Sequence, residues 1–164
     1  MTSGYAKSSP CEARPDSGGT LMDVPSVDVL DDTFVVVPPR TLAAIFADPE
    51  RCRRFWPDLR LTVYADRGDQ GLRWTVRGAL VGTMEVWLEP VLDGTVLHYY
   101  LRADPADKDG TVLPAAPYRG SGGPRCRRAA AETRRRQLAA KRLAFALKDE
   151  LEADREIGMG SRQR

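Results

Sequence analysis

The sequence predicts an α+β fold in which a curved antiparallel sheet wraps around a long C-terminal helix. Three observations predict it. Segments between residues 59 and 102 alternate apolar and polar residues, as strands with one buried face do. Turn signals such as Asp93-Gly94 separate these segments at hairpin spacing. From Arg125 to about Ile157, apolar residues then recur at helical spacing.

The length and composition predict one globular domain with flexible ends. The chain has 164 residues, 42% hydrophobic and 29% charged, and its net charge of +2 does not indicate a polyanion-binding chain as a whole. No apolar run approaches the ~18 residues of a membrane span, and the N-terminus lacks a signal-peptide core, so a cytoplasmic protein is expected. We expect disordered tails at 1–21 and 158–164 around a domain at 22–157, with Met22 as an alternative start.

One strand and two short helices are expected before the hairpins. The β-branched segment Val27–Val37 predicts a strand that two prolines end. Thr41–Ala47 carries apolar residues at helical spacing. Asp48 then caps a second short helix that begins at a proline and ends at Trp56, because Pro57 disfavours the helical conformation in the residue before it.

The hairpins are expected to share one register. A turn centred on Asp93-Gly94 predicts that Leu88 faces Tyr99 and Val86 faces Leu101, with Glu89 opposite His98 and Glu85 opposite Arg102 on the other face. The preceding hairpin pairs Val76 with Met84 and Trp74 with Val86, and the first hairpin turns near Gly68-Asp69. The strand residues predicted to face inward are Leu61, Val63, Trp74, Val76, Met84, Val86, Tyr99 and Leu101.

Residues 104–124 are expected to form a loop before the long helix. The apolar stripe of that helix comprises Ala140, Leu143, Ala144, Leu147 and Leu151. Extended backwards from Ala140, the stripe reaches Arg136 or Gln137 and then Thr133, all polar. Two interpretations of these polar residues stay open: they bind the oxygen atoms of a ligand, or the stripe drifts to solvent near the start of the helix.

Several segments carry a resemblance to a known superfamily: ADPERCRRFWPD, GLRWTVRG, GTMEVWLEP, LHYYLRADP and AAKRLAFALKDELE. Over about residues 24–156 the chain resembles the START-like superfamily, also called SRPBCC or Bet v 1-like, and most of all its small actinobacterial members labelled polyketide cyclase/dehydrase or lipid-transport proteins. The resemblance implies a helix-grip fold, with a cavity between the sheet and the C-terminal helix. It also implies that Phe55 and Trp56 close one end of that cavity. Both also fit as plain core residues, and the two interpretations do not exclude each other.

Few residues suggest chemistry. His98 has no second histidine beside it and is expected on the outer face of the sheet. Cys11, Cys52 and Cys126 are far apart, so neither a disulfide nor a zinc site is predicted. No phosphate-binding or dinucleotide-binding motif is present, and no serine nucleophile has a plausible histidine base. We therefore expect no cofactor, and whether the protein is an enzyme stays open.

The first expected function is binding, with possible transport, of a hydrophobic molecule such as a lipid or polyketide. The second is an aromatase/cyclase-like reaction in which Tyr99 or Arg136 polarises a carbonyl, without an evident general base. The expected ligand-binding residues are Phe55, Trp56, Leu61, Val63, Trp74, Val76, Met84, Val86, Tyr99, Leu101, Thr133, Arg136 and Gln137.

A third expected function uses the arginine-rich start of the long helix. Eight basic residues lie between Arg125 and Arg142, and only Glu132 opposes them. They form a solvated face with i, i+4 ion pairs, or they attract an anionic partner such as a lipid phosphate, an acyl carrier or a membrane surface. Nucleic acid is disfavoured because no aromatic residues interleave with the arginines.

Overall fold

The computed structural model describes residues 25–107, 109–113 and 124–153. The expected tails, the choice between Met1 and Met22, and Cys11 lie outside these residues, and the side chains of residues 124–126 are not described. The elements in chain order are β1 (Val27–Val35), α1 (Pro39–Ala47), α2 (Pro49–Phe55), β2 (Leu59–Asp66), the 3-10 turn η1 (Gly68–Gln70), β3 (Gly71–Gly78), β4 (Leu80–Val91), β5 (Gly94–Pro105) and α3 (Pro124–Glu152).

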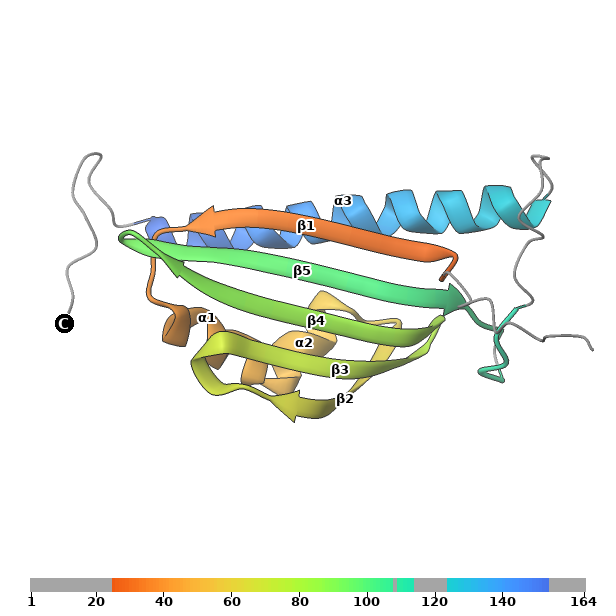
Figure 1. The fold of residues 1–164 in the computed structure, drawn as a ribbon. Helices are drawn as coiled ribbons and strands as arrows, with labels where there is room; N and C mark the ends of the chain where they lie inside the picture. The colour runs from red at the N-terminus through yellow and green to blue at the C-terminus, as the bar shows by residue number, and fades with distance from the viewer. Residues whose placement is uncertain (1–24, 108, 114–123, 154–164) are drawn as a thin grey trace, which may run out of the picture.

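The strands form one antiparallel sheet in the order β1-β5-β4-β3-β2. Figure 1 shows α3 running behind β1, while α1 and α2 lie behind the half of the sheet that ends in β2. The predicted fold class is confirmed: five antiparallel strands, two short helices after the first strand, and a long C-terminal helix in a helix-grip arrangement. None of the described helices combines the length and hydropathy of a membrane-spanning segment.

The helices cover the face of the sheet that the sequence predicts to be apolar. Buried side chains alternate along β1, β3, β4 and β5, because successive residues of a strand point to opposite faces. Trp74, Val76, Met84, Val86, Tyr99 and Leu101 are all buried in one core. On α3 the predicted stripe also packs inward, with Ala140, Ala144 and Leu147 buried and Leu143 and Leu151 packed against the core.

The register of two hairpins differs by two residues from the prediction. Met84, not Val86, pairs with Leu101, because the turn is centred on Leu92-Asp93 and joins Val91 to Gly94. Likewise Trp74, not Val76, pairs with Met84. The first hairpin pairs Leu61 with Val76 and Val63 with Trp74, as predicted. A shift of two residues leaves every side chain on its predicted face, because the side-chain period of a strand is two.

The predicted element ends need small corrections. β1 ends at Val35, two residues before the expected Val37, and α1 begins at Pro39, where proline is favoured in a first helical turn. β5 continues to Pro105, where a loop was expected. The long helix ends at Glu152 rather than near Ile157, and residues 154–157 lie outside the described part.

Candidate functional site

The space between the sheet and α3 is filled by side chains. The void there is about 10 Å³ and is lined by Asp31, Phe46, Val86, Leu97, Tyr99, Ala140, Leu143 and Ala144. A cavity of this size holds at most one water molecule. The void that these residues line is therefore too small for the lipid or polyketide expected between the sheet and the C-terminal helix.

Trp56 is the central aromatic side chain of the core beside this space. It follows the last residue of α2, and its ring is only 3% exposed. The ring stacks on Tyr99 at a centroid distance of 6.0 Å and lies 6.4 Å from the rings of both Phe46 and Trp74. Phe55 packs beside it, half-buried, at 5.6 Å. Both aromatics thus lie against the core, and Trp56 occupies its centre.

Tyr99 is the buried polar group at this centre. Burial raises the pKa of its hydroxyl, although the charge of Arg136 and a hydrogen bond from Trp56 oppose the shift, so the phenol stays neutral. The indole N–H of Trp56 is a donor only, so in that hydrogen bond it donates to the Tyr99 oxygen. A buried phenol requires a hydrogen-bond partner, and for Tyr99 that partner is the core side chain of Trp56.

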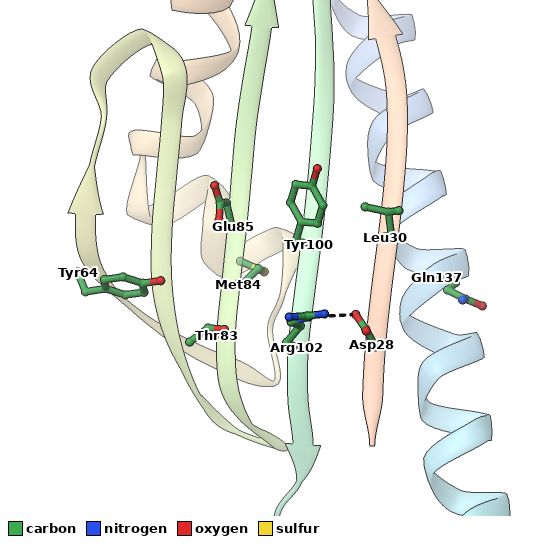
Figure 2. A pocket seen from close by; sticks show the side chains of 9 residues that line it. All are labelled: Asp28, Leu30, Tyr64, Thr83, Met84, Glu85, Tyr100, Arg102 and Gln137. Atoms are coloured by element: carbon green, nitrogen blue, oxygen red, sulfur yellow. Dashed lines mark ion pairs between the residues drawn. The ribbon is translucent and has the colours of Figure 1, made fainter. Parts of the chain in front are cut away.

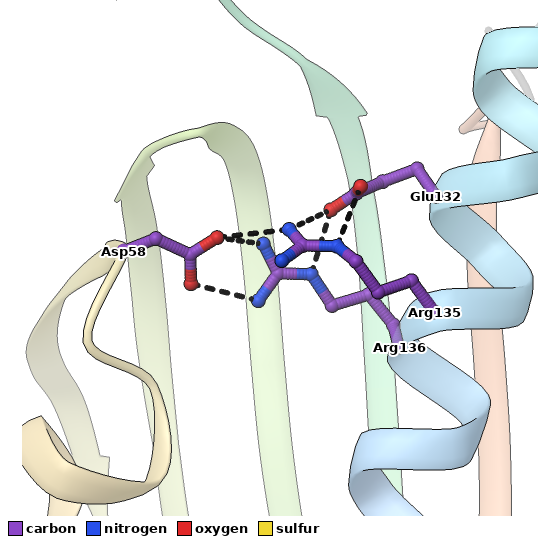
Figure 3. A network of polar contacts seen from close by, with 4 residues as sticks. All are labelled: Asp58, Glu132, Arg135 and Arg136. Atoms are coloured by element: carbon purple, nitrogen blue, oxygen red, sulfur yellow. Dashed lines mark hydrogen bonds and ion pairs between the residues drawn. The ribbon is translucent and has the colours of Figure 1, made fainter.

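An ion-pair network joins α3 to the turn between α2 and β2 (Figure 3). Arg136, 5% exposed, donates from Nη1 to Asp58 Oδ1 at 3.0 Å, from Nη2 to Asp58 Oδ2 at 2.5 Å, and from Nε to Glu132 Oε1 at 2.8 Å. Arg135 contacts the same two carboxylates at 2.7–3.0 Å. The buried guanidinium is fully engaged by protein carboxylates, as a buried charge requires.

The network shifts the protonation of both acids. Burial alone would raise the pKa of Asp58, but hydrogen bonds from Arg136 and Arg135 outweigh it and lower that pKa below its ordinary value. The same opposing causes lower the pKa of Glu132. Both carboxylates therefore remain ionised at neutral pH, and neither is available as a general acid.

An opening on the inner side of the sheet lies at its β2 edge, beside α2. This groove has a volume of about 450 Å³. β2 is the last strand of the sheet, so Leu61 is only half-buried and Val63 is 48% exposed, although both lie on the inner face. The groove is lined by Phe46, Ala47, Pro49, Cys52, Arg53, Pro57, Leu59, Arg60, Leu61, Val63 and Trp74.

The groove has apolar walls and two cations. Arg53 pairs with Glu50 on the surface of α2, whereas Arg60 has no ion-pair partner among the described residues. Cys52 is buried, and its thiol donates to the Phe46 carbonyl at 3.2 Å. Burial raises the pKa of this thiol to about 11, so it is an inert wall residue rather than a nucleophile.

A second hollow lies on the outer face of the sheet (Figure 2). It measures about 640 Å³ and is lined by Asp28, Leu30, Tyr64, Thr83, Met84, Glu85, Tyr100, Arg102 and Gln137. Gln137, one of two alternatives for the inward stripe of α3, is exposed and lines this hollow, because Arg136 takes the inward position. Thr133, the next residue of the predicted stripe, is half-buried.

His98 also lies on the outer face, as predicted. Its ring stacks on Trp87 at 4.6 Å, and its two nitrogens approach Asp32 Oδ1 at 2.7 Å and Glu89 Oε2 at 3.1 Å. The strand partner of His98 is Trp87, not Glu89 as predicted. The Glu89 carboxylate still contacts the His98 ring, from the diagonal position on the neighbouring strand. Among the described residues, no cluster of His, Cys, Asp or Glu has the arrangement of a metal site.

The predicted strand residues of the site therefore separate into two places. Leu61, Val63 and Trp74 line the groove, whereas Val76, Met84, Val86, Tyr99 and Leu101 face the filled interior. Sequence reasoning missed the other half of the groove, notably Phe46, Pro57 and Leu59. The signal that could have found them is the end of the sheet at β2, since an edge strand leaves inward-facing residues uncovered.

No family model and no curated protein matches the chain. Solved structures with a similar chain path include the Aha1 dimer from Colwellia psychrerythraea (TM-score 0.49, 11% identity, 79% of this chain and 99% of that one). DR_A0006 from Deinococcus radiodurans has a TM-score of 0.43 and 15% identity, and the match covers 68% of this chain and 98% of that one. TTHA0849 from Thermus thermophilus has a TM-score of 0.42 and 12% identity, and the match covers 79% of this chain and 99% of that one. Similarity this loose carries no information on function, so the function is inferred from the geometry of this chain.

Proposed function

We propose that this protein binds a small hydrophobic molecule with an anionic end, in the groove between α2 and β2. The observation that carries the proposal is an apolar groove of about 450 Å³ with Arg60 and Arg53 among its lining residues. This volume lies within the roughly 300–1,000 Å³ typical of small-molecule sites, which are mostly apolar with a few polar groups. Lipids and polyketides with a carboxylate have this chemistry.

Exposed apolar area supports a ligand at this place. Val63 and Leu61 point into the groove, and the edge position of β2 leaves Val63 48% exposed and Leu61 only half-buried. Covering apolar area is favourable by roughly 25 cal/mol per Å². Trp74 and Phe46, both buried, provide a rigid wall behind them.

Arg60 selects the charge of the ligand, because Arg53 is already paired with Glu50. Arg60 is exposed and lies at the rim of the groove, because alternation along β2 points its side chain away from the inner face that Leu59 and Leu61 share. Because no described carboxylate neutralises Arg60, a ligand carboxylate is its natural counter-ion.

A binding experiment with two matched probes tests this proposal. Dodecanoate and dodecylammonium have the same chain and opposite charges, and calorimetry at concentrations below micelle formation measures their affinities. We expect dodecanoate to bind more tightly, Val63→Asp to weaken its binding at least tenfold, and Arg60→Glu to remove the preference for the anion. Val112→Asp, at a position of similar exposure (43%) outside the groove, is the control and should leave binding unchanged. Equal affinity of the wild-type protein for both probes, or an equal effect of the two aspartate variants, would contradict the proposal.

The cyclase-like alternative has less support from the geometry. It needs a carbonyl beside Tyr99 or Arg136, but the first contacts Trp56 and the second is held by Asp58 and Glu132. The void of about 10 Å³ next to Tyr99 is too small for any polyketide.

A further inference from the structure

The outer face of α3 repeats one pattern every seven residues. The segments RRAAAET, RRRQLAA and KRLAFAL, residues 127–147, each begin with two basic residues and carry an alanine or larger apolar residue at the fifth position. Seven residues are nearly two helical turns, so equivalent positions align along the helix. The aligned fifth positions are Ala131, Leu138 and Phe145.

This repeat places an apolar stripe between two rows of basic residues. Helical geometry puts Arg127, Arg134 and Lys141 on one side of the stripe, and Arg128, Arg135 and Arg142 on the other. From Arg127 to Phe145 the stripe extends about 27 Å at the rise of an α-helix. We call residues 127, 128, 131, 134, 135, 138, 141, 142 and 145 the basic stripe.

The apolar row of the basic stripe faces away from the sheet. Leu138 is 50% exposed and Phe145 is 53% exposed, both large apolar side chains on a helix whose opposite face is buried. In Figure 1, β1 lies on one side of α3 and no described element lies on the other. The stripe is therefore not explained by packing within the described part of the chain.

Most of the basic side chains in the basic stripe form no ion pair within the described part of the chain. Arg135 is engaged by Glu132 and Asp58, and Lys141 pairs with Asp31 at 2.7 Å. Arg127, Arg128, Arg134 and Arg142 are exposed and have no ion pair among the described residues. The repeat ends where acids begin at Asp149 and Glu150, so the attraction for anions is confined to the first two thirds of α3.

We propose that the basic stripe docks this protein on an anionic lipid surface. Four unpaired arginines attract acidic headgroups at roughly 1 kcal/mol each near the surface, about fivefold in binding per charge. Leu138 and Phe145 then enter the boundary between headgroups and acyl chains, as apolar side chains of interfacial helices do. A nucleic acid would use the arginines but would leave these two side chains without a partner, so a lipid surface accounts for the whole pattern.

Co-sedimentation with vesicles tests the proposal. The probes are pure phosphatidylcholine and phosphatidylcholine with 30% phosphatidylserine, at low and at physiological salt. We expect the wild-type protein to bind the anionic vesicles only. The affinity of Arg134→Gln/Arg142→Gln for them should be roughly tenfold or more weaker. The affinity of Leu138→Gln/Phe145→Gln should also be weaker, and its dependence on salt should be retained. Arg54→Gln/Arg77→Gln removes two exposed arginines elsewhere and should bind like the wild type. Circular dichroism of each variant verifies that α3 remains folded.

Three results would overturn the proposal. Binding to neither vesicle type, or equal binding to both, would exclude an electrostatic lipid contact. Equal losses for the control pair and the stripe pair would show attraction by overall charge alone. The third result has two parts: Leu138→Gln/Phe145→Gln leaves vesicle binding intact, and a single-stranded oligonucleotide or soluble glycerophosphoserine displaces the protein completely. This result would assign the arginines to a nucleic acid or to a free anion instead.

Discussion

Replacing Trp56 with alanine is expected to lower the free energy of unfolding by about 3–5 kcal/mol, the range for removing a large buried aromatic side chain. Trp56 lies between Tyr99, Phe46 and Trp74, so its loss leaves a cavity that three rigid rings cannot fill by small movements. It also removes the hydrogen bond to the Tyr99 hydroxyl, leaving a buried polar group without that partner. Urea denaturation followed by far-UV circular dichroism measures the change.

Trp87→Ala provides the matched control for this substitution. Trp87 is 37% exposed on the outer face and stacks only on one side, against His98. We expect its replacement to cost about 1 kcal/mol or less, the value of an aromatic contact at a partly exposed site. Equal losses for the two tryptophan variants would mean that Trp56 is not the centre of the core.

Replacing Asp58 with alanine is expected to lower the free energy of unfolding by about 2 kcal/mol. Breaking a fully buried pair costs about 3–5 kcal/mol, but 35% of the Asp58 side chain is exposed and Arg136 retains Glu132, so the loss is smaller. Asp28→Ala is the control, because its 3.6 Å pair with Arg102 lies on the surface and contributes roughly 0–1 kcal/mol. Thermal and urea unfolding at neutral pH compare the two.

The same network gives the stability a defined dependence on pH. The pKa values of Asp58 and Glu132 are lower in the folded than in the unfolded protein, so their stabilisation is complete above the ordinary carboxyl range, near roughly pH 4–5. It is lost as the pH falls through the lowered folded values, because protonation breaks the contacts with Arg136 and Arg135. The free energy of unfolding of Asp58→Ala should therefore fall less steeply below about pH 4 than that of the wild type. Parallel slopes would show that Asp58 is not coupled to folding.

The sequence was sufficient for the fold because the strand alternation has a period of two. A two-residue error in the pairing of Val86 left it on the correct face, and a one-residue error would have inverted the strand. Arg136 also lies inward, as one of the two alternatives proposed, because it follows the helical spacing of Ala140 and Ala144. Its partner Asp58 was not predicted, since a contact between residues 78 positions apart has no local signal.

The location of the site could not be predicted from the same patterns. Periodicity shows which side chains face inward, but not whether their volumes fill the interior. In this chain the void on the α3 side is about 10 Å³, whereas the groove at the β2 edge is about 450 Å³. For the same reason Val63 was expected in an enclosed cavity and lies instead in an open groove.

Methyl NMR of the protein titrated with dodecanoate tests the central claim most directly: the interior is filled, and ligands bind at the β2 edge. We predict chemical-shift changes at the methyl groups of Leu61 and Val63, and none at Val86, Leu97 and Ala144, which line the small interior void. Shifts concentrated at Val86, Leu97 and Ala144, with Leu61 and Val63 unchanged, would place the ligand between the sheet and α3 and contradict the account.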